Sequence, residues 1–234
     1  MKGFILAAGY GNRLRPLTDS IPKPLVSVWG RPMIENVILK LEGYGINKIG
    51  INLFHLGNKI ENFIKTKKFN SEFKFFYEKR LLDTGGAIKN AKNFLIDDDF
   101  IVHNSDILTD FDLSSLVDFH LKNGNDVTLA VMERDSSRKL AFNDDMSFSG
   151  WTNLNKNISN GDISGKRLLS FTGIHIALPR IFDFIPEDDV FGIFDFYIKN
   201  VKNLKIFGYE VLPDYWFDVG SIEKLNEVRE KINF

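Results

Sequence analysis

The sequence predicts an α/β fold built around a mixed, mostly parallel sheet. Short apolar runs alternate with amphipathic segments through the first two thirds of the chain, a pattern typical of strand–helix–strand units. Beyond about residue 132 the spacing changes. Turn signals such as Asn-Asp-Asp, Ser-Gly and Asn-Gly then separate short apolar runs over 138–178, which favours a smaller antiparallel portion.

Each element can be bounded from its apolar spacing. The first strand is expected over 4–7, and the first helix over 32–44, with Pro32 suited to its first turn and Gly45 to its end. The other expected strands are 48–53, 73–77, 99–104, 126–132 and 205–211. The other expected helices are 59–68, a segment ending near Phe94, 113–123, 193–203 and 221–232. Asp110 and Asp112 precede the helix at 113 and are expected to serve its N-terminus.

Composition narrows the class of protein. The 234 residues are 44% hydrophobic, enough for a large core, and we expect one domain over 1–234. A net charge of -1 provides no general attraction for nucleic acid or an anionic membrane, so neither is an expected partner. The absence of cysteine excludes disulfides, thiolate zinc sites and cysteine nucleophiles. Without a long apolar stretch or a signal-peptide pattern, a soluble cytoplasmic protein is expected.

The loop after the first strand carries Gly9 and Gly11, and glycine lets backbone N–H groups turn toward an anion. A Walker A loop would need a final Gly-Lys-Ser/Thr, and a dinucleotide fingerprint would need glycine where Leu14 stands. The segment also contains three cations and three prolines: Arg13, Arg15, Lys23, Pro16, Pro22 and Pro24. Composition therefore indicates an anion-binding loop, with a surface loop of solvated charges as the alternative.

Several longer motifs carry a family resemblance. They are LAAGYGNRLRPLT (6–18), PKPL (22–25), GRPMIE (30–35), LLDTGGAIKNA (81–91), NSDI (104–107), FTGIHI (171–176) and YWFDVGS (215–221). Together they resemble the sugar-phosphate nucleotidyltransferases. Among these, the chain is most similar to the N-acetylmuramate 1-phosphate uridylyltransferases or to mannose-1-phosphate guanylyltransferase-like members.

This resemblance implies a three-layer α/β/α, Rossmann-like (GT-A-like) fold with a nucleotide-binding part over about 1–132 and a sugar-binding part over about 133–234. It implies an enzyme of nucleotide-sugar biosynthesis, supplying cell wall or polysaccharide precursors as a monomer or homo-oligomer. The enzyme would join a sugar 1-phosphate to a nucleoside triphosphate, UTP before GTP, with Mg²⁺ as cofactor. Because a phosphate monoester is largely ionised at neutral pH, in-line attack requires charge neutralisation rather than a general base.

By the same resemblance, Arg13, Lys23 and Asp106 form the catalytic set. Arg13 would bind the triphosphate, and Lys23 would reach the α-phosphate and the sugar phosphate. Asp106 and Asp218 would be the metal ligands, as hard oxygen donors that follow separate apolar runs. The alternatives are surface cations and turn or cap aspartates. Arg15 is left out of the catalytic set because its position varies among relatives.

Nucleotide and sugar contacts are assigned in the same way. The nucleotide would be bound by Leu6, Ala7, Ala8, Gly9, Gly11, Arg13, Glu78 and Gly86. A carboxylate at Glu78 only accepts hydrogen bonds, which suits the N–H groups of uracil, thymine or guanine; an ion pair with Lys79 or Arg80 is the alternative. The sugar would be bound by Lys23, Asn153, Thr172 and Gly173, although a turn role is favoured for Asn153.

Two other functions remain open. One is a CTP-dependent enzyme acting on a non-sugar phosphate such as phosphocholine, because the Tyr-Gly and Glu-Lys-Pro sugar motifs of many relatives are not preserved here. The other is a non-catalytic homologue that binds nucleotide sugar, which the intact Arg13, Lys23, Asp106 and Asp218 argue against. Four scattered histidines lack metal-ligand spacing, so structural roles are expected for His55, His103, His120 and His175.

Overall fold

The computed structural model describes residues 1–231. Within them the chain folds into two compact units. The first unit contains residues 1–81, 103–111 and the described part from 213 onward, and the second contains 82–102 and 112–212. Each unit includes residues from both sides of position 132, and the expected single domain with a division near 132 stays a prediction.

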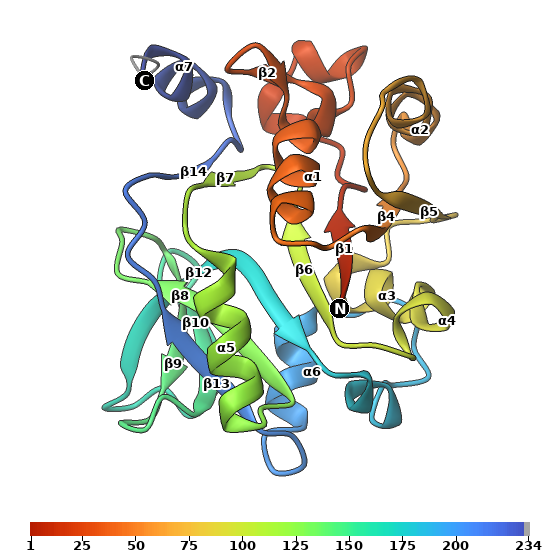
Figure 1. The fold of residues 1–234 in the computed structure, drawn as a ribbon. Coiled ribbons are helices and arrows are strands. Elements are labelled where there is room, and N and C mark those ends of the chain that lie inside the picture. The colour runs from red at the N-terminus through yellow and green to blue at the C-terminus, as the bar shows by residue number, and fades with distance from the viewer. Residues whose placement is uncertain (232–234) are drawn as a thin grey trace. The chain divides into compact units, whose positions relative to one another are not determined.

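The first unit is built on parallel strands. β1 (Lys2–Leu6), β4 (Lys48–Leu53) and β5 (Glu72–Tyr77) lie in the order β1-β4-β5, linked along the chain by α1 (Met33–Gly43) and α2 (Gly57–Thr66) (Figure 1). The apolar runs of β1 and β4 are almost wholly buried, as in strands covered on both faces. Because the strands are parallel, their carboxyl ends and the loops that follow them meet at one edge.

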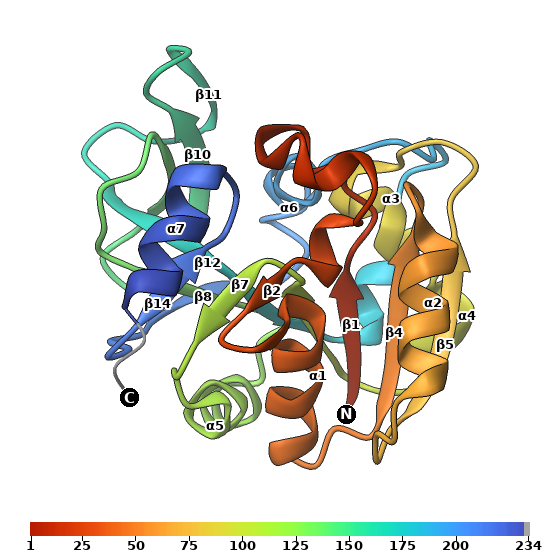
Figure 2. The same cartoon turned by 90° about the horizontal axis from the view of Figure 1, so that it is seen from above.

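Two short antiparallel pairs complete this unit. β7 (Ile107–Thr109) pairs with β14 (Trp216–Asp218), and β2 (Ser27–Val28) pairs with β3 (Arg31–Pro32). After β14 the chain enters α7 (Ile222–Glu230), which Figure 2 shows most clearly. A buried apolar cluster joins these elements to the loop after β1; its members are Leu14, Val26, Val28, Met33, Leu108, Val219, Leu225 and Val228.

The second unit contains mostly antiparallel strands. β9 (Arg138–Phe142), β10 (Phe148–Asn153), β11 (Ile158–Gly161) and β12 (Arg167–Ala177) lie in the order β11-β10-β9-β12. β12 also pairs with β8 (Val127–Met132), which pairs in parallel with β13 (Ile206–Glu210). Its helices are α3 (Asp83–Asn90), α4 (Lys92–Leu95), α5 (Leu113–Asn123) and α6 (Ile193–Lys199). β6 (Phe100–Asn104) runs from this unit into the first.

The α/β class with a mixed sheet is confirmed, as is the antiparallel portion over 138–178. The helix expected over 193–203 ends at Lys199, where the side chain of Asn200 donates to Phe196 O at 2.9 Å and so competes with the helical backbone. The helix expected to end near Phe94 is two helices, α3 and α4, which are separated by Ala91.

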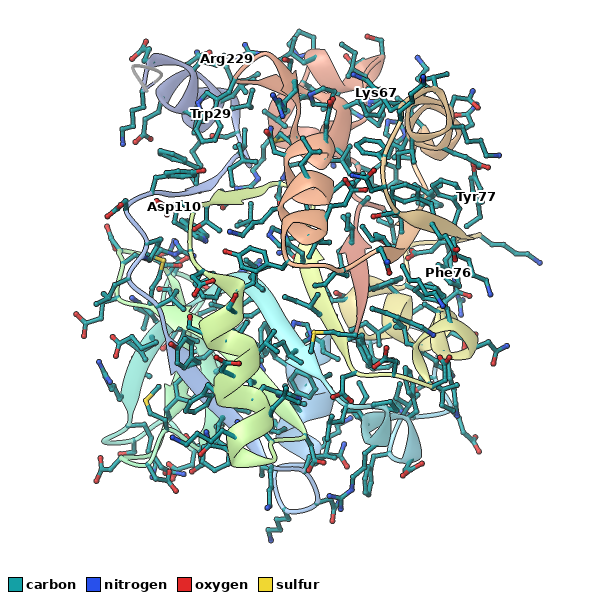
Figure 3. All side chains as sticks on the ribbon, viewed as in Figure 1. Trp29, Lys67, Phe76, Tyr77, Asp110 and Arg229 are labelled. Atoms are coloured by element: carbon teal, nitrogen blue, oxygen red, sulfur yellow. The ribbon has the colours of Figure 1, made fainter. Side chains whose placement is uncertain are left out.

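The expectation that both aspartates serve the helix at 113 was half wrong. Asp112 is the N-cap of α5 and accepts from Ser114 N at 2.9 Å. Asp110, labelled in Figure 3, instead accepts from Tyr215 N at 3.2 Å, so it joins β7 to β14. None of the helices in residues 1–231 combines the length and apolar character needed to cross a membrane.

Candidate active site

The loop after β1 is anchored by its own side chains. Leu14 is fully buried in the apolar cluster, and Thr18 Oγ1 donates to Gly11 O at 2.9 Å. Gly11 has a φ of 69°, and a Cβ there would lie 2.9 Å from Thr18 Cγ2 and 3.0 Å from Lys23 Cβ. A Cβ on Gly9 would meet nothing within 4 Å, so the fold itself does not require glycine at that position.

Lys23 and Asp106 form an ion pair next to this loop. Lys23 Nζ donates to Asp106 Oδ2, and both side chains are mostly buried. Asp106 lies between β6 and β7, where its backbone carbonyl accepts from Val219 N at 3.0 Å. That hydrogen bond, with the pairing of Asp218 opposite Ile107, places the two predicted metal ligands on adjoining segments.

Arg13 and Asp218 converge on Gly220. A Cβ on Gly220 would lie 2.8 Å from a guanidinium nitrogen of Arg13 and 2.9 Å from Asp218 Oδ1, so a side chain there would displace the ends of these two groups. Asp218 Oδ2 accepts from Lys224 Nζ at 2.8 Å. The structure therefore brings together, in one unit, all four residues expected to act on phosphate and metal.

The charge of Asp218 is set by these neighbours. Its partial burial alone would raise its pKa, but the hydrogen bond and charge of Lys224, together with the charges of Lys23 and Arg13, hold the pKa below its usual range. Asp218 is therefore ionised at neutral pH and available as a hard oxygen ligand.

The sequence did not point to Lys224. It lies in the first turn of α7, after the N-cap Ser221, whose side chain accepts from Lys224 N. The positive end of the helix dipole disfavours a cation there. A lysine in the first turn of a helix was therefore the one sequence feature that could have indicated a special role for Lys224. Its contact with Asp218 explains this unfavourable position.

The donor set fits Mg²⁺. Residues 1–231 contain no cluster of three or more His, Asp or Glu side chains that could enclose a metal by themselves. Magnesium is commonly held by one or two carboxylates, with phosphate oxygens and water as its other ligands. Asp106 and Asp218 provide that number of carboxylates, each held by a lysine.

Glu78 follows β5 and is buried. Asn52 Nδ2 donates to Glu78 Oε1 at 2.7 Å, and Asn52 Oδ1 accepts from Ala7 N at 2.7 Å. Ala7 belongs to the loop expected to bind nucleotide, so the structure links that loop to Glu78 through one side chain. Asn52 was missed because a polar residue at a strand end has no distinctive sequence signal.

The residues expected on the sugar side lie in the second unit. Thr172 is buried and its hydroxyl donates to Ala130 O at 2.9 Å, while Gly173 has a φ of 88° where the register of β12 against β8 shifts. Asn153 Oδ1 accepts from Lys156 N at 3.2 Å, as in a turn. Their roles toward sugar stay predictions.

Gly86 also lies in the second unit. A Cβ there would lie 2.0 Å from Asp189 O, so packing within this unit requires glycine at that position. This requirement explains the glycine without a ligand. A role for Gly86 in nucleotide binding stays a prediction.

Three histidines are buried in the structure. Burial lowers the pKa of His103 to about 4, of His120 to about 4 and of His175 to about 3. His120 Nδ1 bonds with the hydroxyl of Thr128 at 2.9 Å. All three rings are therefore neutral at physiological pH.

Comparison with known proteins identifies the family. A family model described as nucleotidyl transferase matches residues 2–142, more than half of the 234 residues. The chain belongs to the nucleotidyl transferase family. The resemblance drawn from the sequence motifs is thereby confirmed.

Two relatives of the chain carry different nucleotide names. The chain is 40% identical over 143 residues to a mannose-1-phosphate guanyltransferase of Gibberella zeae, covering 59% of this chain and 39% of that protein. It is 30% identical over 246 residues to a UTP–glucose-1-phosphate uridylyltransferase of Synechocystis sp., covering 95% of this chain and 61% of that protein. The matches thus span between 39% and 61% of the length of these relatives.

A solved structure shares the fold. The crystal structure of HddC from Yersinia pseudotuberculosis complexed with GMP-PN has a TM-score of 0.77 and 25% identity to this chain. The match covers 98% of each chain.

Proposed function

We propose that the protein joins a nucleoside triphosphate to a sugar 1-phosphate, releasing pyrophosphate. The observation that carries this proposal is the convergence of Arg13, Lys23, Asp106 and Asp218 within one unit, beside a glycine loop. Family membership and the names of the relatives support the same reaction class.

In this reaction an oxygen of the sugar phosphate attacks the α-phosphorus, and the bond from that phosphorus to the oxygen bridging to the β-phosphate breaks. The attacking oxygen is already ionised, so no side chain has to remove a proton. Arg13 is exposed and can present paired N–H donors to phosphate oxygens, and Lys23 supplies a compact charge beside Asp106. These cations lower the repulsion between the two anionic reactants.

Asp106 and Asp218 would hold Mg²⁺. When bound, the metal would supply positive charge to the phosphate oxygens of the nucleotide. Lys224 acts on this pair by keeping Asp218 ionised and oriented through the bond at 2.8 Å. Lys23 holds Asp106 in place through their ion pair.

Glu78 would read the base. A carboxylate can accept from uracil N3–H or from the N1–H and amino edge of guanine. The resemblance to known families, more than this chemistry, gives UTP as the first candidate and GTP as the second. The relatives named for UTP and for guanyl transfer, and the HddC complex with GMP-PN, support these two bases. On the sugar side we propose Thr172, Gly173 and Asn153, with Lys23 on the sugar phosphate.

A matrix of four nucleoside triphosphates against several sugar 1-phosphates, with pyrophosphate release measured in Mg²⁺, tests the proposal. We expect turnover with UTP or GTP and a sugar 1-phosphate, and none without a divalent cation. Turnover confined to CTP with phosphocholine would replace this function. Binding of nucleotide sugar without any turnover would also contradict it.

A further inference from the structure

Asn52 lies on β4, the middle of the three strands β1, β4 and β5, at the sheet edge formed by their carboxyl ends, where nucleotide is proposed to bind. It is near the carboxyl end of β4, aligned with Leu6 of β1 on one side and Phe76 of β5 on the other. Figure 3 labels Phe76 and Tyr77, the two residues that lead into Glu78. Asn52 is 4% exposed, so its side-chain amide must find its partners inside the protein.

The orientation of this amide is determined by its two partners. A backbone N–H can only donate, so the oxygen end of Asn52 must face Ala7 N, at 2.7 Å. The NH₂ end then faces Glu78, where Nδ2 donates to Oε1 at 2.7 Å. Glu78 N is held separately by Leu53 O at 2.8 Å, so the backbone of Glu78 is fixed independently of its side chain.

We propose that Asn52 is a positioning residue for base recognition. Its side chain connects the carboxylate of Glu78 to the backbone of the nucleotide loop. The NH₂ group of Asn52 requires the side chain at position 78 to turn an acceptor atom toward it. Any polar group at position 78 is therefore turned so that its acceptor faces Asn52. The inference rests on the proposed function only in assigning Glu78 to the base.

Substitution of Glu78 by Gln makes this orientation measurable. In Glu78→Gln the Asn52 amide still donates, so Gln Oε1 faces Asn52 and the Gln NH₂ is presented to the base. That NH₂ opposes uracil N3–H but can donate to cytosine N3, which is an acceptor. We expect affinity for UTP to fall about 10- to 100-fold and affinity for CTP to overtake it.

A second substitution should reverse the effect. In Asn52→Asp/Glu78→Gln, the Asp carboxylate accepts both from Ala7 N and from the Gln NH₂, which turns Gln Oε1 toward the base. The double variant should therefore prefer UTP over CTP again. Asn52→Asp alone places two carboxylates within hydrogen-bond distance, so we expect it to lose UTP affinity about 10- to 100-fold. A merely structural role for Asn52 predicts that the double variant binds worse than either single variant.

The experiment is titration calorimetry of the wild-type chain and the three variants with UTP, GTP, CTP and inorganic tripolyphosphate in Mg²⁺. Tripolyphosphate has no base, so its affinity should be the same in all four proteins. If the wild type prefers GTP, the comparison is made between GTP and CTP, with guanine N1–H as the donor in place of uracil N3–H. Thermal unfolding reports folding, and Glu78→Gln, which is isosteric and keeps the Asn52 donor, tests the orientation even if Asn52→Asp does not fold.

Equal affinities of the wild type for all three nucleotides would overturn the inference, because Glu78 would then not read the base. Equal affinities of Glu78→Gln for UTP and CTP would also overturn it, because the amide would be free to turn. Failure of the proposed function is a separate result. If the wild type forms no nucleotide sugar but the four proteins show the predicted order of nucleotide affinities, the inference about Asn52 stands. A wild type that turns over, with variants that bind as it does, overturns the inference alone.

Discussion

His175 gives the structure a measurable sensitivity to acid. It lies on β12 and is 2% exposed, and among the described residues neither ring nitrogen has a hydrogen-bond partner. Aromatic rings surround it, with the centroids of Phe171 and Tyr197 both 5.9 Å away. Burial lowers its pKa from 6.5 to about 3. Because the folded pKa is depressed, the unfolded chain binds protons first as the pH falls.

The size of the effect follows from the two pKa values. Stability is fully present above pH 6.5 and is lost as the pH falls toward 3. The linkage relation gives a loss of about 2 kcal/mol from this residue at pH 5 relative to pH 8. We predict that His175→Phe, which keeps a ring and removes the titration, loses about 2 kcal/mol less than the wild type over that interval.

Urea unfolding of both proteins at pH 8 and pH 5 measures this difference. At pH 8 the variant should be at least as stable as the wild type, because it buries no unpartnered nitrogen. His103 and His120 still titrate in the variant, so some acid loss remains. An identical loss of stability in the two proteins would refute the reasoning.

Three further substitutions and one matched control test the site and its packing. Asp106→Ala should abolish pyrophosphate release while circular dichroism and the unfolding midpoint show an intact fold; unchanged turnover would rule out this residue as a metal ligand. Lys224→Met should raise the pKa of Asp218 and move the acid limb of the kcat/KM profile to higher pH. An unmoved limb would show that the contact between Lys224 and Asp218 at 2.8 Å has no influence on activity. Gly86→Ala should lower the free energy of unfolding by about 2–4 kcal/mol, because the new Cβ would lie 2.0 Å from a backbone carbonyl oxygen. The matched Gly9→Ala places a Cβ with nothing within 4 Å and should cost less than about 0.5 kcal/mol. Equal costs for the two variants would contradict the packing argument.

Local patterns were enough to predict most of the elements. The helix over 113–123 and the strand over 48–53 match α5 and β4 residue for residue, because apolar spacing and an Asp N-cap act within a few residues. The early end of α6 depended on a side chain that bonds to its own helix, which apolar spacing does not report.

The site residues were predictable where neighbouring motifs contain them and not where distant segments meet. Arg13 and Lys23 lie in two neighbouring motifs within residues 6–25, and the structure places them next to carboxylates from two other motifs. Asp110 contacts Tyr215, 105 positions away in the sequence. Asn52 on β4 contacts Ala7, which follows β1, and Glu78, which follows β5. Such partners are set by the register of the sheet, which the sequence pattern alone does not determine.

The proposed site makes the α-phosphorus of a nucleoside triphosphate open to attack. Phosphorus NMR of a reaction containing UTP or GTP, a sugar 1-phosphate and Mg²⁺ tests it directly, because it reports which phosphorus changes its bonds. We predict that pyrophosphate and a sugar-linked nucleoside diphosphate appear together at equal rates. Formation of nucleoside diphosphate with orthophosphate, or triphosphate left unconsumed with every sugar 1-phosphate, would contradict the claim.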